Sequence, residues 1–317
     1  MNFPVFDLHC DTALAMLGRD FFAEGTLKKN QFHLDLERAA GLPGYVQCFA
    51  CFTTPLKKLP GRFTVEDMFE REMSVILREL NANADVIRQV FTPDDIVENR
   101  KNGLMSAILT IEGPAGFGYD PELLENLSQI GFRITTLSWN EKNPLTGSHK
   151  TGGGLTDLGK EYVRQAQKNG MVVDVSHISD EGFWDIMEIT EAPVIASHSN
   201  SRAVWDASRN LTDDMFREIC RTGGVAGFNM CADFVGASPD LDTACDHVLH
   251  FLEMDPEAKH IALGGDLDGI SRMPEGFHGV QDFPVFAQKL LDRGLSEQMV
   301  MNIFWNNALG VMQRCCM

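Results

Sequence analysis

The sequence has too few basic residues for a protein that binds nucleic acid. Its 317 residues include 27 Lys and Arg against 45 Asp and Glu, which gives a formal net charge of -18. Such a charge repels nucleic-acid phosphates and anionic lipid surfaces. The sequence also lacks a run of 18 apolar residues that could cross a membrane. We therefore expect neither nucleic acid nor a membrane as a partner.

We expect no targeting signal at either end of the sequence. No basic residue precedes Arg19, and Asp7 interrupts the first apolar stretch, so the two regions of a secretory signal are missing. The fourth residue from the other end is Arg314 rather than Cys, which argues against prenylation. These features predict a cytoplasmic protein.

The cysteines are too scattered for a disulfide framework. They are Cys10, Cys48, Cys51, Cys220, Cys231, Cys245, Cys315 and Cys316. In a long chain without an export signal, such cysteines are typically buried thiols. Cys48 and Cys51 have the C-x-x-C spacing of zinc sites, but no second pair completes a set of four ligands. We interpret both as core residues.

Tandem repeats, low-complexity tracts and linkers are also missing, which favours a single domain over residues 1–317. Short β-rich apolar runs alternate instead with stretches of helical periodicity. The runs interpreted as strands are residues 3–9, 44–51, 105–112, 132–138, 171–177, 193–198, 224–230 and 260–266. The predicted helices are residues 64–89, 94–102, 121–130, 157–169, 181–190, 213–222 and 241–254. Eight strands that alternate with helices predict the α/β class and a (β/α)8 TIM barrel.

Five of the eight runs end in side chains that can bind a metal or move a proton. These side chains are His9 with Asp11, Glu112, His177, His198 and Asp266. His9 and Asp11 are two positions apart, so on a strand they point to the same face. The C-terminal ends of parallel barrel strands open on one face, where we expect all six side chains to meet. Taken singly, each is more often a helix cap or a solvated side chain.

Three imidazoles and two or three carboxylates are too many ligands for one tetrahedral zinc ion with an open position. They suit two ions about 3.5 to 4 Å apart, bridged by a carboxylate. Imidazole-rich sites favour zinc, although manganese or cobalt can substitute. Many two-metal barrels use a carboxylated lysine at the fourth strand as the bridge, but that run here ends in TTLSWN. Glu112, from the neighbouring run, is the better bridge.

Two other pairs have spacings that can bind metal. His33 and Asp35 follow a polar stretch rather than a buried strand, so we assign them a structural role. His247 and His250 are three positions apart on a predicted amphipathic helix, and we expect them on the helix surface.

The motifs DLHCDT, TIEG, DVSH, APVIASHSNSRAV with SRN, and GGDLDG followed by PEG occur in this order. Together they closely resemble the zinc dipeptidases called membrane or renal dipeptidases, which are amidohydrolase-like barrels. The similarity extends from about Phe6 to Asn306 and Asn307, nearly the whole chain. It implies a metallopeptidase that hydrolyses dipeptides with two zinc ions per chain, usually as a homodimer.

The resemblance also implies roles for individual residues. His9 and Asp11 would hold one zinc ion. His177 and His198 would hold the other, and Glu112 would bridge the two. A hydroxide between the ions would attack the peptide carbonyl.

Two further residues match the substrate machinery of that family. Asp266 matches its acid/base aspartate, which accepts the water's proton and returns it to the departing amine. Arg209 matches the arginine that holds the substrate's terminal carboxylate, for which a planar guanidinium is suited. Without this match, a surface ion pair is an equal interpretation of Arg209.

The sequence departs from the family at two strand ends. Trp139 occupies the place of a histidine that contacts substrate, so a donor to the oxyanion is missing or comes from another group. We expect Trp139 to contact substrate as a wall of the pocket. The seventh run lacks a tyrosine found in some members, which leaves Met230 and Cys231 as candidate pocket residues.

Two alternative functions compete with a two-zinc dipeptidase, whose substrates can include L,D-dipeptides. The first is a related binuclear amidohydrolase that acts on N-acyl amino acids or on another amide or lactone. The second is a barrel that keeps its metals but serves as a binding or assembly protein. Asp266 argues against the second, because a binder needs no proton shuttle.

Overall fold

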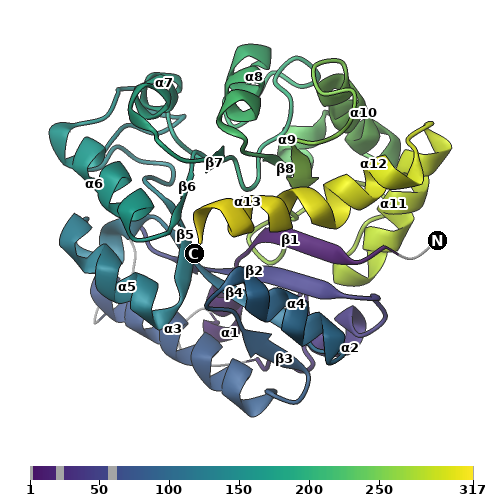
Figure 1. The fold of residues 1–317 in the computed structure, drawn as a ribbon, viewed down its shortest axis with the longest axis horizontal. Helices are drawn as coiled ribbons and strands as arrows, with labels where there is room; N and C mark the ends of the chain where they lie inside the picture. Colours follow the sequence, from purple (N-terminus) through teal and green to yellow (C-terminus); the bar gives the residue numbers. More distant parts are fainter. Residues whose placement is uncertain (1–2, 19–24, 56–62, 317) are drawn as a thin grey trace.

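The computed structural model describes residues 3–18, 25–55 and 63–316. Within these ranges, eight parallel strands follow the order β7-β6-β5-β4-β2-β1-β9-β8, and a bridge between Ala196 and Ala226 joins the two ends into a barrel. A further strand, β3, pairs with β4 outside this path. In Figure 1 the strands lie in the middle of the molecule and the helices surround them. The predicted (β/α)8 fold is therefore confirmed.

The elements have the following bounds. The strands are β1 (Val5–Cys10), β2 (Tyr45–Phe52), β3 (Ile87–Gln89), β4 (Met105–Glu112), β5 (Phe132–Thr136), β6 (Val172–Asp174), β7 (Val194–Ile195), β8 (Ala226–Phe228) and β9 (Ile261–Leu263). The α-helices are α1 (Thr12–Leu17), α2 (Leu36–Ala39), α3 (Val65–Ala82), α4 (Pro93–Lys101), α5 (Leu124–Ile130), α6 (Asp157–Lys168), α7 (Asp180–Ile189), α8 (Asp213–Thr222), α9 (Ala232–Val235), α10 (Leu241–Leu252), α11 (Phe283–Asp292), α12 (Glu297–Met301) and α13 (Asn307–Cys315). Short helical turns are η1 (Pro114–Phe117), η2 (Pro121–Leu123), η3 (Val280–Asp282) and η4 (Asn302–Asn306).

The starts of the helices are encoded locally. Thr64 Oγ1 accepts a hydrogen bond from Asp67 N–H (3.1 Å), and Asp67 accepts one from Thr64 N–H (2.8 Å), which forms a capping box at α3. At α4, Pro93 occupies the first turn and Asp95 accepts from Thr92 N–H (2.7 Å). These caps satisfy backbone N–H groups that the first helical turn leaves without a partner.

One end of the barrel is sealed by apolar side chains. Each of the eight barrel strands, or the residue directly before it, contributes at least one side chain to a single buried cluster, among them Phe6, Val46, Ile108, Ile134, Val172, Ile195, Val225 and Ala262. Helix α13 crosses this end in Figure 1 and packs Ala308, Val311 and Met312 into the same cluster. The rings of Trp305 and Phe6 pack edge-on with their centroids 6.1 Å apart. Polar side chains therefore gather at the opposite end, where the strands finish.

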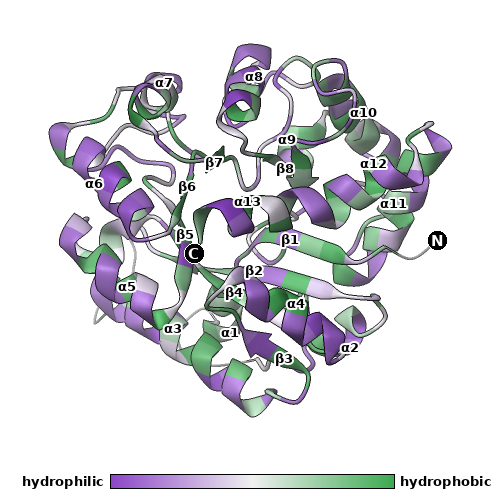
Figure 2. Ribbon diagram, in the orientation of Figure 1, coloured by the Kyte–Doolittle hydropathy of each residue, from purple (hydrophilic) through white to green (hydrophobic). Residues whose placement is uncertain are grey.

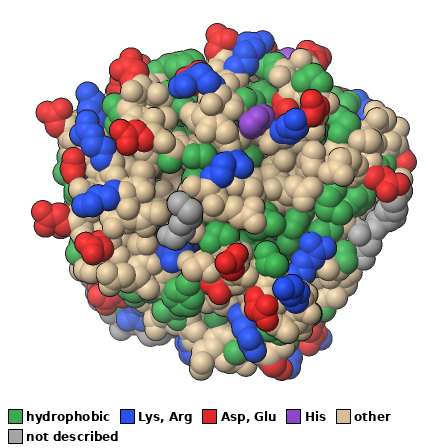
Figure 3. All heavy atoms as spheres, in the orientation of Figure 1, with side chains coloured by type: hydrophobic (Ala, Val, Ile, Leu, Met, Phe, Trp, Pro, Cys, Tyr) green, Lys and Arg blue, Asp and Glu red, His purple; other side chains and the backbone are tan. Residues whose placement is uncertain are grey.

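Apolar residues are concentrated in the barrel strands, and polar and charged residues in the surrounding helices. The barrel strands in Figure 2 are mainly apolar, whereas the surrounding helices carry many hydrophilic residues. Acidic and basic side chains are interspersed on the face shown in Figure 3. Among the described residues, no helix is both long and apolar enough to span a membrane.

The sequence-based element bounds need three corrections. The helix expected over residues 64–89 ends at Ala82, because residues 87–89 pair with β4 as β3. Strands β6, β7 and β9 end three residues before the predicted ends of their runs. The helices of the C-terminal segment, α11 to α13, were not predicted at all.

The C-x-x-C pair confirms its interpretation as core. Cys48 and Cys51 are fully buried free thiols on β2. They are three positions apart on a strand, so they point to opposite faces: Cys48 faces the barrel interior, and Cys51 faces the layer outside it. This arrangement prevents the two thiols from sharing one metal ion.

Candidate metal centre

His9 and Asp11 converge, although not for the reason expected. Strand β1 ends at Cys10, so Asp11 lies beyond it, at the residue that precedes α1. The register of β1 against β2 is also irregular between Asp7 and Cys10, which re-aims the backbone around His9. Even so, His9 Nε2 lies 3.4 Å from Asp11 Oδ2, and both side chains are buried.

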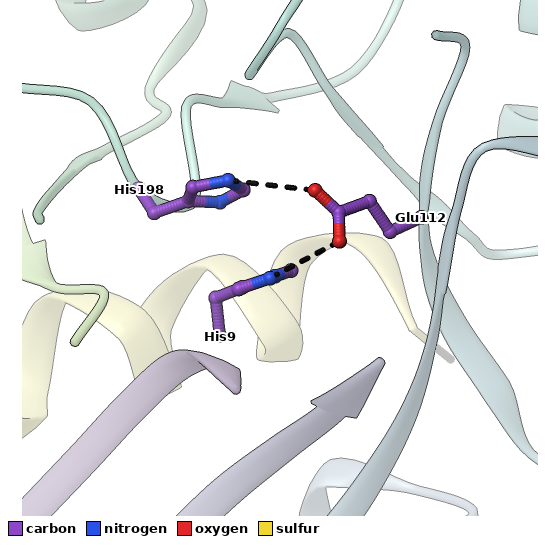
Figure 4. A group of neighbouring side chains, drawn as sticks. All are labelled: His9, Glu112 and His198. Carbon is purple, nitrogen blue, oxygen red and sulfur yellow. Dashed lines mark ion pairs between the residues drawn. The ribbon is translucent and has the colours of Figure 1, made fainter. Parts of the chain in front are cut away.

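Glu112 connects two groups of potential ligands. It is the last residue of β4, and its carboxylate points toward the rings of His9 and His198 in Figure 4. Its Oε2 lies 3.4 Å from His9 Nε2, while its Oε1 lies 2.9 Å from His177 Nε2 and 3.7 Å from His198 Nε2. The two oxygens of one carboxylate thus face different sets of side chains, as a bridging ligand requires.

His177 and His198 lie in the loops after β6 and β7, and their Nε2 atoms are 3.0 Å apart. Burial lowers the pKa of both rings well below the ordinary value of 6.5, and the positive charge of Arg209 lowers it further. Both rings are therefore neutral, which is the form of histidine that binds a metal.

The other residues of the cluster also fit a cation. His9 Nε2 and Asp11 Oδ1 are buried and make no hydrogen bond within the described ranges. A Cβ at position 269 would collide with Asp11 Oδ2 and Asp266 Oδ1, so Gly269 keeps this space open. Burial acts to lower the pKa of His9, but the carboxylates of Glu112 and Asp11 raise it well above 6.5. Without a metal, the positive charge that balances Glu112 and Asp11 is the proton on His9. A bound metal ion would supply this positive charge in place of the proton.

Sequence reasoning missed the groups that orient the ligands. Ser197 Oγ lies 2.7 Å from His198 Nδ1 and donates a hydrogen bond to Asp174 Oδ2. Asp174 is the last residue of β6, and its Oδ1 also accepts from the backbone N–H of Ser197 (2.9 Å). These hydrogen bonds fix the Nδ1 side of the His198 ring and leave Nε2 available for a metal. Such partners are typical of metal-binding histidines.

Asp266 lies beside the cluster rather than within it. Its Oδ1 is 3.9 Å from His9 Nε2, and its Oδ2 accepts a hydrogen bond from Asn229 Nδ2 (3.0 Å). Burial raises the pKa of Asp266 to about 7, against the lowering effect of His9. Asn229 was not singled out from the sequence, although it directly follows β8 and directly precedes Met230 and Cys231. Asn229 therefore holds the Asp266 carboxylate through Oδ2 and leaves Oδ1 without this contact.

A cavity of about 410 Å³ opens above these groups. Its wall includes Asp11, Glu112, His177 and Asp266. Trp139 also lines it, and the Trp139 ring packs edge-on against Phe52 with the centroids 5.0 Å apart. Of the two residues suggested at the seventh run, Cys231 lines the cavity, whereas Met230 is fully buried away from it.

Arg209 carries a buried charge next to the cavity. It lines a second, small cavity of about 10 Å³, which shares His177 with the larger one. Its guanidinium lies 5.5 Å from the ring centroid of Phe234, which lines the larger cavity. It donates to Ser199 Oγ (3.1 Å) and to the carbonyl of His198 (3.0 Å), and its Nε has no partner among the described residues. Neither partner is charged, so Arg209 is not the surface ion pair of the alternative interpretation.

The two remaining pairs have structural roles. Asp35 caps α2 by accepting a hydrogen bond from Arg38 N–H (2.8 Å), and His33 Nδ1 accepts one from Asp268 N–H (3.0 Å). The expectation for His247 was wrong: this residue is fully buried and bonds to Ser201 and Val235, because α10 turns it toward the barrel.

The chain as a whole is similar to known peptidases. A family model described as membrane dipeptidase (peptidase family M19) matches residues 1–315. An uncharacterized dipeptidase of Schizosaccharomyces pombe is 32% identical over 214 residues, which cover 65% of this chain and only 52% of that protein. A solved structure of a family M19 metallopeptidase, dipeptidase AC, has a TM-score of 0.88 and 25% identity, with 99% of each chain covered. A Rhodobacter sphaeroides metallopeptidase, solved with a phosphinate mimic of the dipeptide L-Ala-D-Ala, has the same fold: its TM-score is 0.88 at 24% identity, over 99% of this chain and 100% of that one.

Proposed function

Because the chain belongs to the membrane dipeptidase family, peptidase family M19, we propose that it hydrolyses the peptide bond of dipeptides with two zinc ions. The proposal rests above all on Arg209, which is buried beside the candidate metal centre and has no charged partner among the described residues. A buried charge of this kind is costly unless a ligand of opposite charge completes it. A dipeptide brings a carboxylate close to the bond that is cleaved.

Five residues would hold the ions. His9 and Asp11 would bind one, His177 and His198 the other, and Glu112 would bridge them through its two oxygens. When bound, such a pair of ions supplies an activated water and a Lewis acid for the substrate carbonyl. Zinc is proposed because three imidazoles dominate the donor set.

The residues around this centre would orient the substrate and move its protons. Asp266 would accept the proton of the attacking water at its Oδ1 and pass it to the departing amine, while Asn229 keeps its Oδ2 in place. Arg209 would bind the terminal carboxylate, and its free Nε adds a donor for that purpose. Trp139 would close the side of the pocket against a substrate side chain.

The test is a substrate panel measured on the purified protein together with its metal content. The panel contains L,L- and L,D-dipeptides, the matching dipeptide amides and N-acyl amino acids. We expect two zinc ions per chain, turnover of dipeptides, and at least about tenfold lower kcat/KM for the amides, which lack the carboxylate. Turnover of N-acyl amino acids alone would favour the alternative amidohydrolase. Bound metal without any turnover would favour a binding protein.

The response to D-residues in the same panel decides whether L,D-dipeptides are substrates.

The family resemblance also supports a homodimer. Sedimentation velocity measures the oligomeric state directly. A monomer at micromolar concentration would contradict that part of the proposal.

A further inference from the structure

Asn140 lies in the cavity directly after Trp139, where the family's substrate-contacting histidine is missing. Its side-chain oxygen is held from two sides. Oδ1 lies 2.7 Å from His149 Nε2 and 3.2 Å from His177 Nδ1. His149 is held in turn, because its Nδ1 lies 2.8 Å from Ser208 Oγ. The Asn140 side chain therefore has a defined position at the wall of the cavity.

The chemistry of His177 determines which way the amide of Asn140 points. The Nε2 of His177 faces Glu112 and His198, so the other ring nitrogen, Nδ1, carries the hydrogen when His177 binds a metal. That N–H needs an acceptor, and only the oxygen of the carboxamide can accept. His149 Nε2 donates to the same oxygen, while its Nδ1 accepts from the hydroxyl of Ser208.

This orientation leaves the amide nitrogen of Asn140 free. Both hydrogen-bond contacts of the described Asn140 side chain use Oδ1 and neither uses Nδ2, and Asn140 lines the same cavity as Glu112 and Asp266. Two N–H donors thus remain next to the groups that would hold the metals and move the proton. An amide fixed in this way needs no reorganisation when negative charge develops near it.

We propose that Asn140 Nδ2 donates a hydrogen bond to the carbonyl oxygen of the scissile peptide bond and stabilises the negative charge that forms there. Asn140 thus supplies the hydrogen-bond donor that the family's histidine would provide at position 139. Trp139 itself serves only as an apolar wall of the cavity. This inference rests on the proposed dipeptidase function. A second role of Asn140, as the acceptor that orients His177, is separable because it uses the oxygen and not the nitrogen.

Asn140→Asp separates the two roles, because it has nearly the same shape and keeps an oxygen for both imidazoles but loses the N–H donors. We expect kcat to fall ~10²- to 10³-fold, with KM changed by less than about threefold and with wild-type zinc content. Asn140→Ala tests whether the negative charge added by Asn140→Asp causes the loss of kcat. The alanine variant adds no charge, and at saturating zinc its kcat should fall by the same factor. Asn126→Asp, an exposed substitution on α5, is the matched control and should leave kcat unchanged.

Binding of a phosphinate dipeptide analogue, which mimics the tetrahedral intermediate, gives a second measurement. Its affinity should fall by the same factor as kcat/KM in both variants, because both depend on the oxyanion contact. Wild-type kcat in either variant, loss of zinc from Asn140→Asp, or unchanged phosphinate affinity would overturn the inference. A wild-type protein that hydrolyses no dipeptide would instead overturn the proposed function, and this result is obtained before any variant is made.

Discussion

At the scale of single residues, the backbone of the candidate site is held in an uncommon conformation. His177 and Asp266 have φ angles of 70° and 56°, in the left-handed region that L-residues rarely adopt. Each costs about 1 to 2 kcal/mol relative to an ordinary conformation. Backbone hydrogen bonds from His149 N–H to the His177 carbonyl (2.9 Å) and from Asp266 N–H to the His9 carbonyl (3.1 Å) hold them there. Such strain is typical of positions where function outweighs local stability.

The first prediction at this scale concerns the proton carrier. Asp266→Asn keeps the shape of the side chain and an oxygen that can accept from Asn229, but it removes the group that takes up a proton. We expect kcat for dipeptides to fall ~10²- to 10⁴-fold, with zinc content and thermal stability close to wild type. Steady-state kinetics and metal analysis check this. Turnover equal to that of the wild type would eliminate Asp266 as acid and base.

At the scale of elements, helix α3 supports the site from outside the barrel. Glu72 on α3 is fully buried, and its Oε2 accepts a hydrogen bond from the backbone N–H of Phe52 (2.7 Å) at the end of β2. Its Oε1 has no partner in the described parts of the chain. Burial raises the pKa of Glu72 well above its ordinary value of 4.5. The helix therefore holds the end of β2 with a carboxyl group that favours its protonated form.

The second prediction follows from the sign of this pKa shift. Above its ordinary pKa, Glu72 has lost its proton in the unfolded chain but retains it in the folded chain, so its contribution to stability decreases as the pH rises. Glu72→Gln removes this titration. Between about pH 5 and pH 8, the free energy of unfolding should therefore fall less in the variant than in the wild type. Urea unfolding at both pH values measures the difference, and parallel behaviour of the two proteins would refute the role of Glu72.

At the scale of the whole molecule, the pairing of β1 with β9 brings two distant segments of the sequence together at the site. Strand β1 pairs with both β2 and β9. Asp11 N–H donates to the Leu267 carbonyl (2.8 Å), and Thr12 Oγ1 donates to Asp268 Oδ2 (2.6 Å). The cluster thus depends on contacts between segments that are more than 250 positions apart, and any ion bound there links them.

The third prediction is that metal removal destabilises the entire barrel. An ion present at about a thousand times its Kd adds ~4 kcal/mol to the free energy of unfolding. Since ~1 kcal/mol corresponds to about 1.5 °C in a protein of 317 residues, at ~2.1 cal/mol/K of unfolding entropy per residue, treatment with a chelator should lower the Tm by on the order of 6 °C. Calorimetry measures this, and added zinc should restore the Tm. An unchanged Tm after complete removal of metal would mean that the cluster holds no structural ion.

Local patterns were enough to predict the strand-end residues and the barrel. His9, Glu112 and His198 were found because each follows an apolar run, and parallel strands of a barrel finish at one rim. Strand β3 was missed because three residues carry too little periodicity to be separated from the helix before them. Asn140 and Asn229 were missed because a carboxamide in a loop has no pattern of its own, and its role depends on which neighbours fold against it.

The sequence by itself determined the alternation of strands and helices and the kinds of side chain that end the strands, because hydrophobic periodicity and residue chemistry are local properties. Only the tertiary structure decided that the two oxygens of Glu112 face different histidines, that the buried Arg209 has no charged partner in the described parts of the chain, and that two imidazoles orient Asn140. These features arise when the barrel closes and excludes water from groups that lie far apart along the chain.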